Sequence, residues 1–122
     1  MVKHHANQEN TEEKMEKTLS LYQKLNGTDF RQTDENGNIL NGTRIGEDGK
    51  TILRFRDGLL DGDVFNSNGK LIVTKPAVEC GGHQEYWRHN KLHRDGGLPA
   101  VLSNGLKDKE WWIGGVRQSE EP

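Results

Sequence analysis

Two tryptophan-centred segments near the carboxyl end of this 122-residue chain align with one another. Residues 85–94 align with 110–119, so that Trp87 matches Trp112 and Asn90 matches Gly115. An earlier stretch aligns with both and has Phe55 at the tryptophan position. Self-similarity of this kind indicates supersecondary units that stack on their neighbours. The aligned aromatic positions are therefore predicted to be the framework of the fold.

The repeated unit is predicted to be a β-hairpin. Asparagine or aspartate followed by glycine is a strong hairpin-turn signal, and it occurs at residues 36–37, 48–49, 57–58 and 68–69. The runs between these turns predict short strands at 43–45, 51–55, 63–65 and 71–74. Only 30% of the residues are hydrophobic, so the hairpins must share a thin core anchored by a few large side chains.

A helix is predicted before the hairpins. Asn10 and Glu13 form a capping box. The apolar residues that follow at helical spacing are Met15, Leu19, Tyr22 and Leu25, and Gly27 then ends the helix. One narrow stripe needs a docking surface. The helix therefore either covers the open end of the sheet or binds a partner.

The predicted fold class is mainly β with one N-terminal helix (α+β). The antiparallel hairpin repeats are expected to form an elongated, curved, single-layer sheet. We divide the chain into a disordered N-terminus at 1–9, a helix at 10–27, a repeat domain at 30–117 and a loose tail at 118–122. A loop insert at 74–83 is expected inside the repeat domain. It either joins two half-arrays or carries a function of its own.

Alternation along strands assigns the aromatic residues to two faces of the sheet. Phe55, Trp87 and Trp112 are predicted to form a structural aromatic row on the inner face. The other face carries Arg54, Tyr86 and Trp111, which either the helix or a partner must cover. Tyrosine, tryptophan and arginine are the residue types that dominate binding energies at protein interfaces.

His93 and Arg94 have no counterparts in the last copy, where Gln118 and Ser119 stand. A purely structural rule of the repeat therefore does not account for them. The predicted partner-binding set comprises Arg54, Tyr86, Trp111, His93 and Arg94.

Several of these segments resemble a known repeat family. Residues 36–42 and 56–62 resemble MORN-type repeats, in which an aromatic residue precedes spaced glycines. Residues 85–119 are similar to a bacterial and viral variant that reads Trp-x-Asn-Gly-Lys-x-His-Arg, followed by a glycine-rich turn into Pro-Ala. The most specific match is 92–101. The resemblance implies a hairpin array used for scaffolding or recognition, in some arrays at a membrane surface, and no shared catalytic activity.

The chain departs from the pattern of the family at three places, one of which is extra length at Lys107-Asp108, between Gly105 and Glu110. Asn90 replaces a glycine, and asparagine is the commonest other residue at positive φ. The last copy lacks His-Arg, as expected of a terminal, capping unit.

Three groups of residues suggest a chemical role as an alternative to the repeat. Cys80, His83, His89 and His93 loosely imitate zinc-ligand spacing. His93 followed by Asn104 and Leu106 is similar to the His…Asn run of HNH nucleases, whose paired metal ligands the chain lacks. Cys80 beside His83 is a candidate nucleophile and base. The repeat explains the same residues better, so we expect no catalytic residue, metal or cofactor.

The sequence as a whole favours a non-enzymatic protein-binding module. The net charge is −2, and the sequence has no basic stripe that would favour nucleic acid or a membrane surface. The lone Cys80 and the lack of a long apolar run predict a cytoplasmic protein. Its partner is expected to be a protein, and the sequence is also compatible with a homodimer. The narrower hypothesis is a phage or mobile-element inhibitor of a bacterial defence effector or nuclease, or an antitoxin. The alternatives are an HNH-like nuclease centred on His93 and a MORN-type scaffold at a membrane.

Overall fold

A computed structural model describes residues 22–119, and over this range the chain is mainly antiparallel β. The predicted β class is thus confirmed. The strands are β1 (Gly42–Ile45), β2 (Ile52–Arg56), β3 (Leu59–Leu60), β4 (Asp63–Phe65), β5 (Leu71–Thr74), β6 (Val78–Cys80), β7 (His83–Glu85), β8 (Trp87–Arg88), β9 (Lys91–Leu92), β10 (Val101–Ser103), β11 (Asp108–Glu110), β12 (Trp112–Ile113) and β13 (Val116–Arg117).

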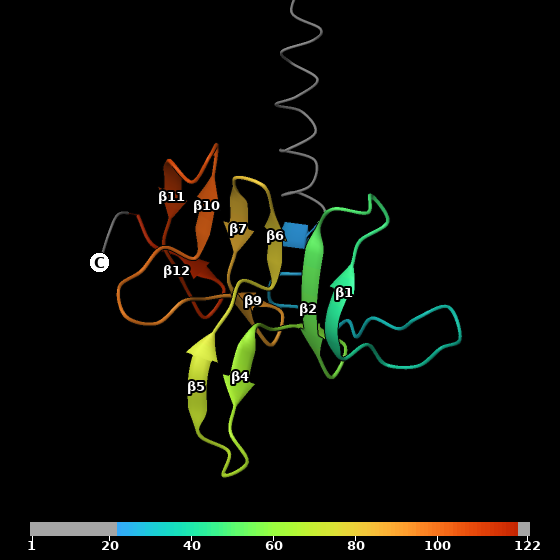
Figure 1. Cartoon of the computed structure of the whole chain (residues 1–122). Helices are drawn as coiled ribbons and strands as arrows, with labels where there is room; N and C mark the ends of the chain where they lie inside the picture. The colour runs from blue at the N-terminus through green and yellow to red at the C-terminus, as the bar shows by residue number, and fades with distance from the viewer. Residues whose placement is uncertain (1–21, 120–122) are drawn as a thin grey trace, which may run out of the picture.

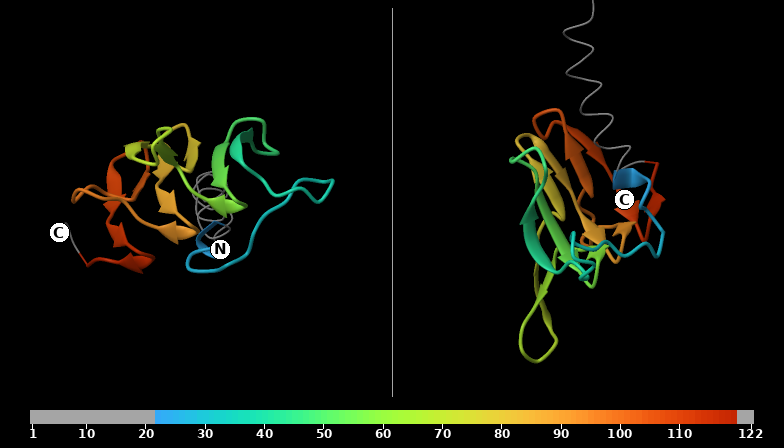
Figure 2. Two further views of the ribbon diagram at one scale, coloured as in Figure 1. Left: turned by 90° about the horizontal axis from the view of Figure 1, so that it is seen from below. Right: turned by 90° about the vertical axis from the view of Figure 1, so that its right-hand side faces the viewer.

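One sheet organises the molecule (Figure 1). It has seven strands in the order β1-β2-β6-β7-β10-β11, with β3 paired to β2. Three two-stranded hairpins accompany it, namely β4–β5, β8–β9 and β12–β13. The side view in Figure 2 shows the β4–β5 hairpin projecting well below the other strands.

Three tight hairpins have the same turn. Their two central residues all have positive φ, as a type I′ turn requires. The pairs are Asp57 and Gly58 (57° and 80°), His89 and Asn90 (49° and 61°), and Gly114 and Gly115 (55° and 86°). The predicted positive φ of Asn90 is therefore confirmed. These turns follow Phe55, Trp87 and Trp112 at the same distance along the chain.

The same three turns are linked by one repeated hydrogen bond. The N–H groups of Gly58, Asn90 and Gly115 donate to the carbonyls of Leu40, Leu60 and Leu92 at 2.8, 3.0 and 2.9 Å. Each hairpin thus bonds to the one before it. A second bond repeats within each unit, from Asp61 to Arg54, from His93 to Tyr86 and from Gln118 to Trp111. Sequence units that align therefore also hydrogen-bond alike.

The core lies between the inner face of the sheet and the short hairpins. Trp87, Leu60, Leu92 and Val78 are fully buried there, and Phe55 is nearly so. Trp112 is half-buried and packs against this cluster, as do Tyr22, Leu25 and Leu40 from the amino-terminal side. The indole N–H groups of Trp87 and Trp112 each donate to the carboxylate two residues earlier, Glu85 and Glu110, at 2.9 Å.

The expectation of a loop insert at 74–83 is wrong. This stretch contains β6 and the start of β7, which pair with each other in the middle of the sheet. Gly81 and Gly82 form the turn between them, and Gly82 lies against the backbone of Gly105 too closely for any side chain. The missed signal is Pro76-Ala77-Val78, which repeats Pro99-Ala100-Val101. Ala77 and Ala100 accept equivalent bonds from the N–H groups of Arg54 and Tyr86.

The predicted N-terminus and helix fall mainly outside the described residues. Residues 1–21 lie outside the described range, so the structure describes only the end of the 10–27 segment. There Tyr22 and Gln23 are helical, and a turn leads to Gly27 at φ 81°. In the predicted loose tail, Gln118 bonds to the carbonyl of Trp111 at 2.8 Å, so this residue is part of the last repeated unit.

Asn90 does more than replace glycine in a turn. Its side-chain Oδ1 accepts the N–H of Leu60 at 2.7 Å, and its Nδ2 donates to the carbonyl of Phe30 at 3.0 Å. Replacing Asn90 with glycine keeps the turn but leaves the buried Leu60 N–H without a partner. We expect Asn90→Gly to lower the free energy of unfolding by about 2 kcal/mol, measured by urea denaturation.

His89 provides the matched control, because it lies in the same turn at positive φ but is exposed. His89→Gly relieves the backbone conformation and removes only the 3.6 Å contact of the exposed imidazole with Asp61, so it should change stability by less than about 1 kcal/mol. Equal effects of the two substitutions would show that Asn90 serves only the turn.

Candidate functional site

The predicted partner-binding residues are largely engaged with their own chain. The Arg54 guanidinium forms an ion pair with Glu79 and donates to the carbonyl of Pro76. Tyr86 is buried, and the guanidinium of Arg94 lies 3.8 Å from its ring centroid. Arg94 also donates to the carbonyl of Pro99 at 3.1 Å. These contacts hold the outer face together and leave few polar groups for a partner.

His93 is held at both ring nitrogens. Its Nδ1 accepts the backbone N–H of Gly114 at 2.8 Å, and its Nε2 lies 2.7 Å from Asp95. An accepting Nδ1 carries no proton, so Nε2–H is the donor to the carboxylate. Trp111 is similarly engaged, since its indole N–H donates to the carbonyl of Gly97 at 3.0 Å. The structure therefore gives both residues local structural contacts.

The suggested zinc ligands do not come together. Across residues 22–119, no group of three or more histidine, cysteine, aspartate or glutamate side chains is arranged to hold a metal ion. His83 instead lies 2.8 Å from Glu85, and both side chains are buried. Cys80 is a free, half-buried thiol.

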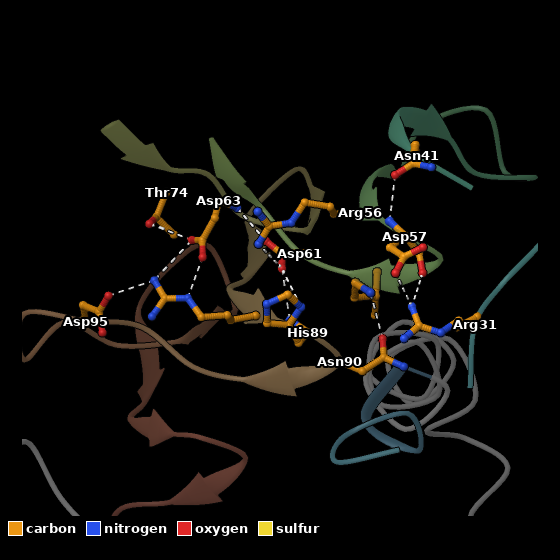
Figure 3. Close-up of polar contacts among 12 residues, drawn as sticks. Arg31, Asn41, Arg56, Asp57, Asp61, Asp63, Thr74, His89, Asn90 and Asp95 are labelled. Carbon is orange, nitrogen blue, oxygen red and sulfur yellow. Dashed lines mark hydrogen bonds and ion pairs between the residues drawn. The ribbon is translucent and has the colours of Figure 1, made fainter. Parts of the chain in front are cut away.

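A network of arginines and aspartates fixes the base of the projecting β4–β5 hairpin (Figure 3). Asp63 is almost fully buried and accepts from Arg88 at 2.5 Å and from the Thr74 hydroxyl at 3.0 Å. Arg88 also contacts Asp95 at 2.8 Å. Hydrogen bonds from Arg88 and then His93 lower the pKa of Asp95. A buried carboxylate such as that of Asp63 needs complete pairing. The network therefore positions the hairpin rather than offering a reactive group.

The described chain has an open cleft, which we call the inner cleft. It has a volume of about 920 Å³ and lies between the amino-terminal segment and the β1–β2 hairpin. Its lining residues are Tyr22, Leu25, Phe30, Gln32, Thr33, Asp34, Glu35, Leu40, Arg44, Ile45, Gly46, Glu47, Asp48, Thr51, Leu53 and Phe55. The floor of the inner cleft is thus continuous with the core, because Leu40, Leu53 and Phe55 belong to both.

Large apolar side chains are exposed in this cleft. Phe30 is 62% exposed and Ile45 is 61% exposed, and they belong to different segments of its wall. Apolar groups that converge on a concave surface are typical of binding sites, whereas single exposed apolar residues are common everywhere. The inner cleft therefore has the shape and composition of a docking site.

The rim of the inner cleft is acidic. It carries Asp34, Glu35, Glu47 and Asp48, with Arg44 as the basic residue among the lining side chains. The Thr51 hydroxyl, then the N–H groups of Thr51 and Lys50, hold the pKa of Asp48 at about 2, below its ordinary value of 3.8. Burial, followed by repulsion from Asp48, raises the pKa of Tyr22. The rim thus carries a persistent negative charge.

The sequence contains a signal for this site outside the repeats. Ile45 is followed by Gly46-Glu47-Asp48-Gly49, a turn that places two carboxylates beside an apolar residue. Phe30 lies between the predicted helix and the first hairpin, outside any repeated unit. Its role as an opposite wall depends on how these segments fold back, which residue periodicity does not encode.

Comparisons with known proteins give no match for the chain. Neither a family model, a curated protein nor a solved structure is significantly similar to it. Between residues 22 and 119, the structure contains no helix with the length and apolar character needed to cross a bilayer.

Proposed function

We propose that this chain is a non-enzymatic protein-binding module and that the inner cleft is its main binding surface. The observation that carries the proposal is the joint exposure of Phe30 and Ile45 in a cleft of about 920 Å³. The residues that the sequence assigns to binding support placing the binding surface at the inner cleft instead, because Arg54, Arg94 and His93 already have partners within the chain.

The chemistry of the cleft defines what it binds. Apolar walls favour a side chain such as leucine, methionine or phenylalanine as the anchor. The acidic rim favours lysine or arginine beside that anchor, because complementary charge speeds encounter and selects partners. The partner segment is therefore an apolar sequence flanked by basic residues. Its affinity should fall as salt is added.

We also propose that the chain is a MORN-type hairpin-repeat protein with an elongated, curved array. The support is the recurring turn and its bond to the preceding hairpin, at Gly58, Asn90 and Gly115. Within the protein-binding class, our narrower proposal is a cytoplasmic inhibitor of a bacterial defence effector or nuclease, or an antitoxin. Fold alone does not select among these activities.

Capture of proteins from a bacterial lysate tests the role of the cleft when matched variants are compared. Ile45→Arg places a charge in the apolar wall and should abolish retention of the specific partner. Val116→Arg is the control, because Val116 is equally exposed at 63% but lies on β13, outside the cleft. The proposal fails if every retained protein binds the two variants and the unmodified chain alike.

A further inference from the structure

Hydrogen bonds define the projecting β4–β5 hairpin at its base and at its tip. At its base, Arg88 and Thr74 bond to Asp63, and the N–H of Lys75 donates to the carbonyl of Gly62 at 2.9 Å. At its tip, the side chain of Asn66 accepts the N–H groups of Asn68 and Lys70, each at 2.9 Å. A ribbon held at its base and closed by a hydrogen-bonded turn presents a defined surface, although it projects away from the core (Figure 2).

This ribbon exposes an unusual amount of apolar surface. Phe65, Leu71, Ile72 and Val73 are between 36% and 59% exposed. The β4–β5 sheet has two strands, and no other strand of residues 22–119 pairs with either edge. Strand β5 also has neither a charged residue nor a proline within Leu71–Thr74. Proteins normally protect an exposed edge with such residues or with a β-bulge. The register against β4 shifts by one residue, so that Ile72 has no partner residue, whereas Val73 and Thr74 pair regularly with Val64 and Asp63. The regular part of β5 therefore presents an edge without a charge or proline of its own, beside the exposed side chain of Ile72.

We propose that the edge of β5 pairs with an extended strand of a protein partner whose apolar residues are flanked by carboxylates. Pairing of this kind adds a strand to the ribbon through main-chain hydrogen bonds. The hairpin shares no lining residue with the inner cleft. The two surfaces therefore bind independently, and either can fail without the other.

The flanking charges exclude a second copy as the occupant. Lys70 and Lys75 stand at the two ends of β5, and both are exposed. If two copies of β5 paired side by side along their full length, lysine would lie opposite lysine in either the parallel or the antiparallel orientation. Like charges directly opposite each other destabilise a strand pair.

Other charges near the ribbon do not change this preference. Asp63 is neutralised by Arg88, and the guanidinium of Arg56 lies over the Phe65 ring at 4.4 Å. The accessible charges beside β5 are therefore positive. They favour glutamate or aspartate at the ends of the incoming strand.

A charge-reversed version of the chain supplies a matched probe. Lys70→Glu/Lys75→Glu keeps the same apolar strand but flanks it with carboxylates. Sedimentation equilibrium should find the unmodified chain and the double variant each monomeric at about 1 mM, and a heterodimer when they are mixed. The heterodimer should weaken with added salt. Circular dichroism of each chain establishes that it is folded.

Two further variants locate the contact. Ile72→Asn in the unmodified chain removes an exposed apolar group of β5 and should weaken the heterodimer about tenfold or more. Ile45→Arg, which blocks the inner cleft, should leave the heterodimer unchanged. Lack of association between the folded chains overturns the proposal. Self-association of the unmodified chain that Ile72→Asn abolishes also overturns it, because the occupant is then a second copy.

Discussion

Replacing Trp87 with alanine is expected to lower the free energy of unfolding by about 4 kcal/mol, which is enough to unfold much of a domain of ordinary stability. Trp87 is fully buried at the centre of the hydrophobic cluster. Its removal leaves a large cavity and takes away the indole donor to the buried carboxylate of Glu85. Urea denaturation followed by far-ultraviolet circular dichroism measures the change.

Trp112→Ala is the matched control for this prediction. Trp112 occupies the equivalent position and makes the same indole–carboxylate bond at the same length, but it is only half-buried. Its replacement should cost about 2 kcal/mol. The difference between the two variants isolates the contribution of burial. Equal losses would mean that the carboxylate bond, rather than packing, determines the effect.

Gly62→Ala is expected to have a similarly large effect for a different reason. A Cβ atom at position 62 would overlap the carbonyl oxygen of Lys75, at the base of the projecting hairpin. Backbone atoms cannot move aside as a flexible side chain does. We expect a loss of about 3 kcal/mol or more, or displacement of the hairpin from the sheet.

Gly46→Ala controls for the general effect of adding a methyl group. Neither Gly46 nor Gly62 has a positive φ, and the nearest atom to a Cβ at Gly46 is 3.4 Å away. This variant should change stability by less than about 1 kcal/mol. Heteronuclear NMR spectra of Gly62→Ala would distinguish the two outcomes, since local displacement shifts resonances of 63–75 and leaves those of the core in place.

The hairpin architecture was accessible from the sequence because its turns are local. An asparagine- or aspartate-glycine pair specifies a turn within a few residues, and strands β4 and β5 match the predicted 63–65 and 71–74. The error at 74–83 arose because Gly81-Gly82 is typical of a loop, although here it closes a central hairpin. Aligning Pro76-Ala77-Val78 with Pro99-Ala100-Val101 would have corrected it.

The binding surfaces were less accessible because exposure depends on contacts between distant segments. Tyr86 was expected to face a partner, yet Arg94 covers its ring. Residue type alone assigns both to an interface, and only their relative position shows that they satisfy each other. Conversely, Phe30 and Ile45 have no place in the repeat, and folding brings them into one cleft.

The amino-terminal segment is fastened to the far end of the chain. The side chain of Asn26 bonds to Leu92 and to Gly115, and the N–H of Gly27 bonds to the carbonyl of Asn90. During synthesis on the ribosome, residues 26–27 therefore emerge early but lack their last partner until Gly115 has been made. The earlier hairpins have their sequential neighbours much sooner. The first described part of the chain to be translated is thus among the last to complete its contacts.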